Sequence, residues 1–320
     1  MHKIPVGVLG ASGYAGRELC GLIAHHPGLE LAFASANEQR GKQLRLGSRD
    51  MIYVATEDAP LGQAEVVFTA LPHGASAKWV GNARSSGARV VDLSSDFRPG
   101  SNDGAAPYGL TELMRPKIPG AGIVANPGCY PTAVLLGVAP LLFKGRVLPG
   151  ATINVSAASG VTGAGYTPRP DLLFAEVAED FRAYSVGNEH RHLAEMRAVV
   201  TELGGESNDI LFTPHLLPVA RGILATITVP VTEAGDDPGE LWREYYRGEP
   251  FIEIADEPPS LRDVVRRNVV RMSITRAANV RQSTLVIIAA IDNLMKGAAG
   301  QALQNANLLL GLKEQSGLPL

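Results

Sequence analysis

Very little in this sequence points to a disulfide-stabilised, membrane-bound or nucleic-acid-binding protein. Its 320 residues include only two cysteines, Cys20 and Cys129, which is too few for a disulfide framework and typical of a reducing compartment. The formal net charge of -3 shows no basic excess with which to bind nucleic acid. Prolines and charges interrupt every apolar run before it reaches the roughly 18 residues of a membrane span. A strand-like run at 4–9 follows the first three residues directly, so we expect no secretory signal and a cytoplasmic protein.

The length and the patterning indicate two domains without a flexible linker. In the first half, strand-like and helical runs alternate, which predicts βαβ units and a mostly parallel sheet. In the second half the strand-like runs are longer, which favours an α+β domain with a largely antiparallel or mixed sheet. We therefore predict an α/β Rossmann-type dinucleotide-binding domain and an α+β substrate or dimerisation domain. The predicted bounds are 1–128 for the first domain, with a C-terminal helix at 294–320 returning to it, and 129–293 for the second.

A glycine-rich loop follows the first strand-like run and precedes a helical segment. It is a G-x-x-G-x-x-G variant of the dinucleotide fingerprint. Glycines let the backbone approach a pyrophosphate closely, and the start of a helix presents unpaired N–H groups to it. The residues that we expect to contact the cofactor here are Gly10, Ser12, Gly13, Tyr14, Ala15 and Gly16.

The end of the second strand-like run bears on the choice between NAD and NADP. An Asp or Glu at this place usually binds the ribose of NAD. Here the run ends at Ser35, and Arg40 and Lys42 follow closely. Hydroxyl and cationic groups suit a 2′-phosphate, so we expect NADP, bound by Ser35 and Arg40. Glu38 argues against this interpretation, and a solvated charged loop is the alternative.

Two further strand-like runs end in polar or glycine-rich loops, at 72–74 and 94–98. Ligands bind at the carboxyl ends of parallel strands. We therefore expect Pro72 and His73 to contact the cofactor. A surface-loop histidine is the alternative for His73.

Cys129 is placed as a nucleophile would be. A turn at Pro127 and Gly128 delivers it to the front of an apolar run at 133–142, and Pro131 suits a first helical turn. Backbone N–H groups and the helix dipole at such a start stabilise a thiolate, which is the nucleophilic form. The alternative is a small buried apolar residue.

Three other segments carry groups suited to chemistry. His190 and His192 are natural proton donors near neutral pH. They are two residues apart, so they do not share a helix face, and no third ligand is spaced with them; we expect no metal site. The loop at 159–165 is able to bend around a ligand, or is a simple connector. Arg221 directly precedes a strand-like run, where we expect it to bind a carboxylate or phosphate through two hydrogen bonds. A surface salt bridge is the alternative.

Several motifs together make the chain resemble the N-acetyl-gamma-glutamyl-phosphate reductase family of arginine biosynthesis, nearly from end to end. The cysteine segment and the Lys296 segment are the most specific of them. One motif departs from the family pattern, because the histidine motif continues with Leu193-Ala194-Glu195 where the family usually has Pro-Glu-Ile. The motifs that carry the resemblance are Gly10 to Gly16, Leu93 to Arg98, Tyr108 to Glu112, Asn126 to Thr132, His190 to His192, Phe212 to Leu216 and Lys296 to Ala302.

The resemblance implies NADPH-dependent reduction of N-acetyl-gamma-glutamyl phosphate to N-acetylglutamate 5-semialdehyde and phosphate, through a thioester on Cys129. It implies that His190 is the base that activates Cys129 and the acid that protonates the developing alkoxide, with His192 as the alternative. It places Lys296 and Gly297 near the nicotinamide, with tight helix packing as the alternative. It also implies a homo-oligomer, a dimer or a tetramer. The residues that we expect to bind the substrate are Ser94, Arg98, Ser159, Gly160 and Arg221.

Two related activities and one unrelated role stay open at this point. Aspartate-semialdehyde dehydrogenase shares the chemistry and the overall design, but the sequence around Cys129 favours the first family. A lysine-pathway relative would act on a carrier-bound substrate, yet no cluster of basic residues suggests a docking site for an acidic carrier. A non-catalytic NADP-sensing regulator would retain the fold, and it would have no need of a helix-start cysteine with a histidine partner.

Overall fold

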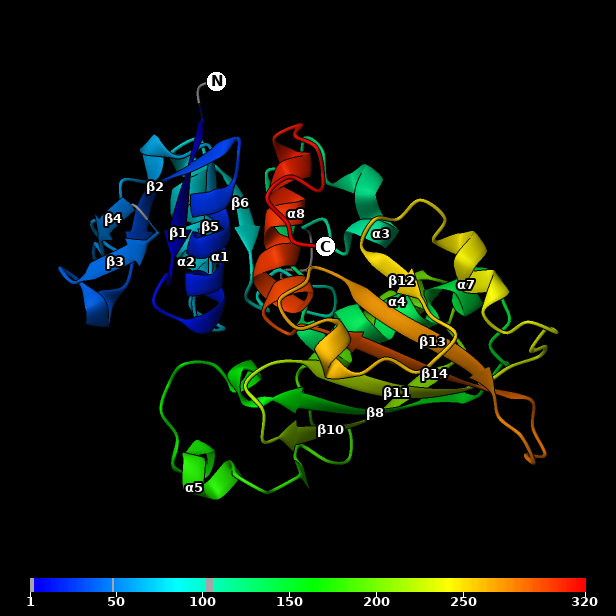
Figure 1. The fold of residues 1–320 in the computed structure, drawn as a ribbon. Coiled ribbons are helices and arrows are strands. Elements are labelled where there is room, and N and C mark those ends of the chain that lie inside the picture. The colour runs from blue at the N-terminus through cyan, green and yellow to red at the C-terminus, as the bar shows by residue number, and fades with distance from the viewer. Residues whose placement is uncertain (1–2, 48, 102–105) are drawn as a thin grey trace. The chain divides into compact units, whose positions relative to one another are not determined.

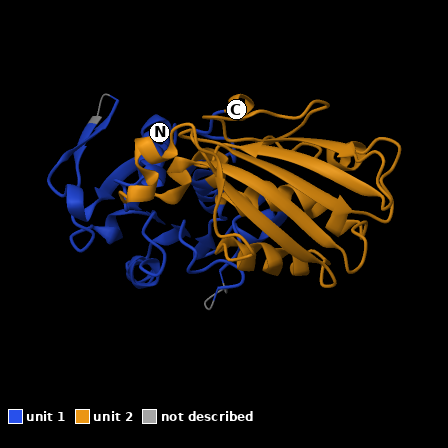
Figure 2. Cartoon of the chain, turned by 90° about the horizontal axis from the view of Figure 1, so that it is seen from below, with its two compact units in different colours: residues 1–128, 298–319 blue, residues 129–297, 320 orange. Residues whose placement is uncertain are grey.

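The computed structural model describes residues 3–47, 49–101 and 106–320, and the chain divides into two compact units. Unit 1 consists of residues 1–128 and 298–319, and unit 2 consists of residues 129–297 and Leu320 (Figure 2). Unit 1 is thus built from two separate stretches of chain. Its second stretch begins at Ala298 rather than at residue 294.

The core of unit 1 is a parallel sheet of five strands in the order β2-β1-β5-β6-β7. The parallel pairing confirms the expectation from the alternating strand-like and helical runs. β5 is buried along its whole length, as is typical of a sheet covered on both faces. Because β2 and β5 flank β1, the strand order reverses there, at the place where such sheets bind ligands. The strands are β1 (Ile4–Leu9), β2 (Leu29–Ser35), β5 (Val66–Thr69), β6 (Arg89–Asp92) and β7 (Ile123–Ala125).

Helices and a small hairpin complete unit 1 (Figure 1). In α1 the buried residues include Leu19, Cys20 and Ile23, spaced as on one helix face. The returning helix α8 is tied into the unit because Gln301 and Asn305 each donate to the carbonyl oxygen of Gly109, at 2.9 Å. The remaining elements of the unit are α1 (Tyr14–His25), α2 (Ser76–Ser85), α3 (Thr111–Met114), α8 (Gly300–Leu309) and the antiparallel pair β3 (Gln43–Leu46) and β4 (Arg49–Ile52), with 3₁₀ turns at Asn37–Gln39, Leu61–Gln63 and Arg115–Lys117.

Unit 2 is built on a seven-stranded mixed sheet in the order β12-β13-β14-β11-β8-β10-β9. The pairs β8/β10 and β12/β13 are parallel and the others are antiparallel, which confirms the predicted mixed sheet. Along β11 buried residues alternate with half-buried ones, so one face of this strand is covered. The strands are β8 (Thr152–Gly160), β9 (Arg182–Ala183), β10 (Asp209–Leu217), β11 (Ile223–Pro230), β12 (Ile252–Ile254), β13 (Val270–Arg276) and β14 (Thr284–Ile291).

The covering element is α4 (Cys129–Phe143), an almost wholly apolar and buried helix. Pro140 lacks an N–H group, so the carbonyl oxygen of Leu136 loses its usual helical donor, and the hydroxyl of Tyr246 donates to it instead at 2.7 Å. Across the described ranges of the chain, none of the helices is both long and apolar enough to cross a membrane. The other helices of unit 2 are α5 (Phe174–Val177), α6 (His192–Glu202) and α7 (Glu240–Tyr245), with 3₁₀ turns at Val161–Ala164, Pro170–Leu172 and Leu261–Asp263. A π-helical turn at Met295–Ala299 begins in unit 2 and ends in the second stretch of unit 1.

Candidate active site

The two cysteines occupy contrasting environments. Cys129 is the first residue of α4 and is half-buried. Cys20 lies on the buried face of α1, where desolvation raises the pKa of its thiol to about 12. A thiol reacts through its thiolate and needs access, so Cys129 is the cysteine suited to nucleophilic attack.

Gly297 packs directly against Cys129 within unit 2. A β-carbon at Gly297 would lie only 2.8 Å from the β-carbon of Cys129, and its N–H group donates to the carbonyl oxygen of Asp292 at 2.9 Å. The neighbouring Lys296 is fully buried, with its Nζ 5.3 Å from the centroid of the Phe251 ring. These two residues were expected near the nicotinamide. At position 297 the approach that leaves no room for a side chain is the one to Cys129.

Two tyrosines form a hydrogen-bonded pair close to Cys129. Tyr184 donates from its hydroxyl to that of Tyr130 at 3.2 Å, and Tyr130 donates to the carbonyl oxygen of His215 at 3.3 Å. Burial is the main cause that raises the pKa of both tyrosines, and the nearby charge of Cys129 raises both further. Both hydroxyls therefore stay protonated at neutral pH and lie within electrostatic range of the Cys129 sulfur.

His190 is enclosed by aromatic rings. Its ring centroid lies 5.5 Å from that of Tyr130, 5.7 Å from Tyr184 and 5.3 Å from Phe212, all with edge-on geometry. Burial, and next the positive charge of Arg191, lower the pKa of His190 to about 4. Its Nδ1 accepts a hydrogen bond from the backbone N–H of His192 at 3.2 Å. The structure thus brings His190 into the same cluster as Tyr130, the residue next to Cys129.

The loop that carries His190 is held to the edge of β10 by a residue that sequence reasoning missed. Asn188 has a φ of 66°, in the left-handed region that asparagine tolerates better than most residues. Its side-chain oxygen accepts from the N–H of Phe212 at 2.8 Å, and its side-chain nitrogen donates to the carbonyl oxygen of Ile210 at 2.9 Å. The Gly187-Asn188 pair is a turn signal, but only the fold shows what the asparagine binds.

His192 is the first residue of α6 and is buried, with its ring 4.8 Å from that of His190. The helix begins here although the segment that follows lacks a proline. Helix starts do not require proline at the first position, where it is only favoured. The backbone N–H of His192 donates the hydrogen bond to His190. The centroid of the His192 ring lies 6.1 Å from that of Tyr130.

Arg221 is paired with a buried carboxylate that the sequence analysis did not single out. Its Nη1 lies 3.4 Å from Oδ2 of Asp292, which is fully buried. Asp292 also accepts through Oδ1 from the N–H groups of Leu294 and Met295, at 2.7 and 3.1 Å. Asp292 directly follows the apolar strand β14, and a polar residue at a strand end is the signal that would have pointed to it.

The segment at 159–165 is more ordered than the flexible loop expected from its composition. β8 runs through Ser159 and Gly160, and a 3₁₀ turn follows at Val161–Ala164. A β-carbon at Gly160 would lie 2.8 Å from the carbonyl oxygen of Ala220, so only glycine fits this crossing. Ser159 is buried, and its hydroxyl donates to the carbonyl oxygen of Gly160 at 3.1 Å.

In unit 1 the glycine-rich loop between β1 and α1 is packed closely at two of its three glycines. Gly10 has a φ of 77°, and a β-carbon there would lie 2.3 Å from the carbonyl oxygen of Ala70. A β-carbon at Gly16 would lie 2.3 Å from the carbonyl oxygen of Gly10, whereas Gly13 has only one neighbour, at 3.6 Å. The first and third glycines are thus needed for packing and the second borders open space. Helix α1 begins at Tyr14, followed by Ala15, two residues after Ser12. Its first turn has no acidic residue to oppose an anion.

The other expected cofactor contacts are divided between exposed and buried positions. Arg40, Pro72 and His73 are exposed, and the ring of His73 accepts through Nδ1 from the N–H of Ser95 at 2.9 Å. Ser35 is buried, and its hydroxyl pairs with that of Thr56 at 3.2 Å. The charged group of this set that is open to solvent is therefore Arg40.

Ser94 and Arg98, expected to bind the substrate, face the interior of unit 1. Ser94 is buried and donates to the carboxylate of Asp92 at 2.6 Å. Arg98 is also buried, and its guanidinium donates to the carbonyl oxygens of Asn126 and Leu93 at 2.8 and 2.7 Å. These contacts shape the loop after β6 and the chain that precedes Cys129.

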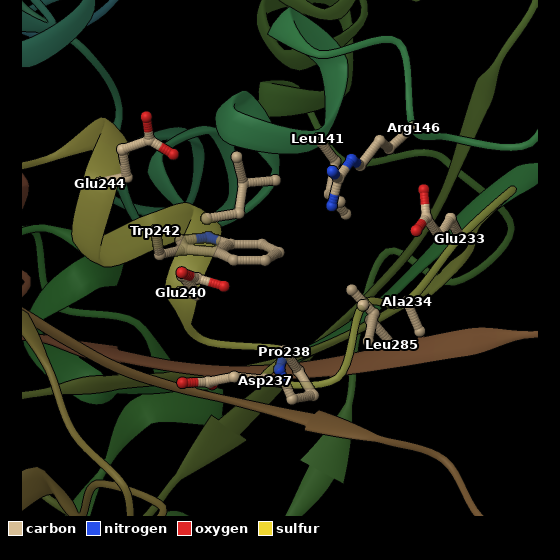
Figure 3. Close-up of a pocket in the computed structure, with 12 residues that line it drawn as sticks. Leu141, Arg146, Glu233, Ala234, Asp237, Pro238, Glu240, Trp242, Glu244 and Leu285 are labelled. Carbon is tan, nitrogen blue, oxygen red and sulfur yellow. The ribbon is translucent and has the colours of Figure 1, made fainter.

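A separate cavity of about 240 Å³ lies in unit 2, between α7, the end of α4 and the loop after β11. Figure 3 shows Arg146 and Glu233 on one side of it and Trp242 on the other. Trp242 is fully buried and donates to the carbonyl oxygen of Gly137, so its polar atom is already satisfied. Neither cysteine and none of the histidines described above lines this cavity.

Comparisons with known proteins agree with this arrangement. The family described as semialdehyde dehydrogenase, NAD binding domain, matches residues 5–121, and semialdehyde dehydrogenase, dimerisation domain, matches residues 129–293. Two curated relatives, from Citrifermentans bemidjiense and Neisseria gonorrhoeae, are 41% and 39% identical to the chain. Each alignment covers 99% of this chain and 98% or 97% of the relative, and both relatives are named N-acetyl-gamma-glutamyl-phosphate reductase. The chain belongs to this family.

Solved structures share the fold of this N-acetyl-gamma-glutamyl-phosphate reductase family member. Aspartate semialdehyde dehydrogenase II from Vibrio cholerae matches with a TM-score of 0.79 at 21% identity, over 97% of this chain and 99% of that chain. The Candida albicans aspartate semialdehyde dehydrogenase with NADP matches with a TM-score of 0.70 at 15% identity, over 96% and 98%. At these identities the likeness establishes the fold alone.

Proposed function

We propose that this protein reduces N-acetyl-gamma-glutamyl phosphate to N-acetylglutamate 5-semialdehyde and phosphate, with NADPH, in arginine biosynthesis. The observation that carries the proposal is the half-buried Cys129 at the start of α4, beside the cluster of Tyr130, Tyr184 and His190. The near full-length relatives with this name support the choice of substrate.

Cys129 has the central role in the proposed reaction. Its thiolate attacks the acyl carbon, the bond from that carbon to the phosphate oxygen breaks, and a thioester remains on the sulfur. NADPH, when bound, supplies the hydride that reduces this thioester. The carbon–sulfur bond then breaks, the aldehyde carbonyl forms and the Cys129 thiolate is restored. The N–H groups at the start of α4 stabilise the thiolate in both steps.

We propose His190 as the group that acts on the oxygen of the reacting acyl group, because its ring packs against Tyr130, the neighbour of Cys129 in the chain. His192 is the alternative. It is more deeply buried than His190 and begins α6, so its side chain is better suited to holding His190 in place.

For the substrate we propose Arg221 as the anion-binding group, because its guanidinium is held by Asp292 and retains 22% of its side-chain exposure. Ser159 and Gly160 form the adjoining wall through the contacts of Gly160 with the chain at Ala220. Ser94 and Arg98 have their polar groups bound inside unit 1, so we propose that they support the chain leading to Cys129.

For the cofactor we propose NADP, bound at the Gly10 to Gly16 loop. The residues of this loop fit a dinucleotide because Gly13 borders open space at the start of a helix. Arg40 is the proposed contact for the 2′-phosphate, since it is exposed while the Ser35 hydroxyl is turned toward Thr56. Pro72 and His73, at the end of β5, are proposed to line the same site.

We further propose that the protein is a homo-oligomer, a dimer or a tetramer. The match of residues 129–293 to a dimerisation domain supports this. Size-exclusion chromatography with light scattering would contradict it by showing a monomer at micromolar concentration.

The reaction is tested by following NADP reduction by the purified protein in the reverse direction. The substrates are N-acetylglutamate semialdehyde and phosphate, with aspartate semialdehyde assayed alongside. We expect the absorbance of NADPH to increase in a phosphate-dependent way with the acetylated substrate only. Activity with aspartate semialdehyde instead would contradict the proposed substrate. Tight NADP binding without turnover of either would favour a regulator.

A further inference from the structure

His190 is held in a way that decides which of its two nitrogens carries a proton. A backbone N–H group donates and never accepts, so the bond from the N–H of His192 requires an unprotonated Nδ1 on His190. In a neutral imidazole the proton then resides on Nε2. This assignment depends on geometry alone, because the donor of the bond is a backbone amide.

The surroundings oppose a positive charge on this ring. The groups that face it are the hydroxyl-bearing rings of Tyr130 and Tyr184, the ring of His192 and the apolar Phe212, and Arg191 adds a positive charge in the chain. Protonation at Nδ1 would also break the bond to the His192 amide, at the start of α6, where N–H groups already favour negative charge. Burial and Arg191 lower the pKa of His190 for the same reasons.

We infer that His190 acts as a neutral imidazole whose Nε2–H donates a hydrogen bond to the acyl oxygen on Cys129, and that it does not take the proton of the Cys129 thiol. This inference rests on the proposed function. The role differs from the general base and acid expected from the sequence. Neutral imidazoles that polarise a carbonyl oxygen are known from other enzymes, with the ring likewise placed at a helix start.

The proton balance of the reaction is consistent with this role. The resting nucleophile is the thiolate, which has released its proton to solvent. Its attack on the acyl carbon expels phosphate, which takes one proton from solvent. After hydride addition the negative oxygen regains its double bond and the carbon–sulfur bond breaks, so the thiolate returns without a proton. His190 therefore stabilises the negative oxygen in both steps and keeps its own proton throughout.

Two substitutions of His190 distinguish a role as hydrogen-bond donor from a role as base. His190→Gln keeps a neutral side-chain N–H donor that is not a base, whereas His190→Ala removes both functions. We expect kcat of H190Q to remain within about tenfold of the unmodified protein, and kcat of H190A to fall about a hundred- to a thousand-fold, as for loss of an oxyanion donor. His25→Gln, on the exposed end of α1, is the control and should leave kcat unchanged. Equal loss in H190Q and H190A would overturn the inference.

A second experiment needs no substrate, so it stays informative even if the proposed reaction is wrong. The rate of Cys129 alkylation by iodoacetamide is measured against pH in the unmodified protein and in H190A. We expect the same midpoint in both, because a neutral His190 is not the partner of the thiolate. A midpoint that rises in H190A would overturn the inference.

The third experiment uses the unmodified protein, so it does not depend on the folding of a variant. Long-range ¹H–¹⁵N correlation NMR with ¹⁵N-labelled histidine reports which ring nitrogen is protonated. At pH 7 we expect His190, assigned by loss of its signals in H190Q, to show a protonated Nε2 and a bare Nδ1. A protonated Nδ1 would overturn the inference.

Discussion

Gly297 leaves no room for a side chain beside Cys129, because its β-carbon would lie 2.8 Å from the β-carbon of the cysteine. Gly297 follows the buried Lys296 in the π-helical turn after β14, and its N–H group is bound to the carbonyl oxygen of Asp292. The turn that follows β14 thus sets the space available to the proposed nucleophile. Both residues belong to unit 2.

Gly297→Ala should therefore displace Cys129 and reduce kcat about a hundred-fold, since a shift of the nucleophile by about 1 Å has effects of this size. The free energy of unfolding should fall by about 1–3 kcal/mol from overpacking. Steady-state kinetics and urea denaturation measure the two effects. The control is Gly21→Ala on α1, where a β-carbon meets nothing within 4 Å and stability should be equal or slightly higher. Equal kinetics in both variants would contradict the argument.

The two cysteines should differ in reactivity. Under native conditions at pH 8, iodoacetamide should modify Cys129 and leave Cys20 unmodified, because burial raises the pKa of the Cys20 thiol to about 12. Peptide mass spectrometry locates the modification. Cys129→Ala should lose all turnover. Cys20→Ala should lose stability and have a far smaller effect on activity. Turnover retained by C129A would rule out the thioester.

Asp292→Asn should leave Arg221 without its paired charge, and where its amide nitrogen replaces Oδ2 it loses the acceptor of the Arg266 N–H group. We expect the free energy of unfolding to fall by about 1–3 kcal/mol and the Michaelis constant for the acyl phosphate to rise. Asp209→Asn is the matched control, because it breaks an exposed pair with Arg197 and should cost about 0–1 kcal/mol. Comparable losses in the two variants would mean that Asp292 has no special role.

Arg40→Ala should raise the Michaelis constant for NADP much more than that for NAD, because only NADP has a 2′-phosphate for the guanidinium to bind. The control is Arg247→Ala, an exposed arginine of unit 2, which should leave both constants unchanged. Equal increases for the two cofactors in R40A would contradict the assignment of the 2′-phosphate site.

Acid should destabilise the protein partly through His190. Its pKa is about 4 in the folded state and near 6.5 when unfolded, so between these values the unfolded chain binds the extra proton. The stability contributed by the neutral ring is thus present above about pH 6.5 and is lost as the pH falls toward 4. Urea denaturation from pH 7 to pH 4 should show a smaller loss in His190→Gln than in the unmodified protein. The exposed His25→Gln should lose as much as the unmodified protein, and a similar loss in all three would argue against a buried neutral His190.

Local patterns in the sequence were enough to predict much of the fold and the proposed nucleophile. The Gly10 to Gly16 loop lies between a strand and a helix, and the turn at Pro127 and Gly128 does place Cys129 at the first position of α4. Each of these features depends on residues within about ten positions of one another. Backbone preference and hydrophobic periodicity act over that range, so they are readable without the fold.

The surroundings of Cys129 depend on contacts between residues far apart in the chain. Pairing of β9 with β10 and the side chain of Asn188 hold the His190 loop, and the end of β14 brings Asp292 to Arg221. The same dependence applies to Arg98 and Ser94, which were expected to bind the substrate, because their side chains donate to carbonyl and carboxylate oxygens inside unit 1. The sequence by itself determined the kinds of element and pointed to the proposed nucleophile. Only the tertiary structure decided which polar groups are already bound inside the protein and which are left to act, because strand register and burial, not local spacing, supply their partners.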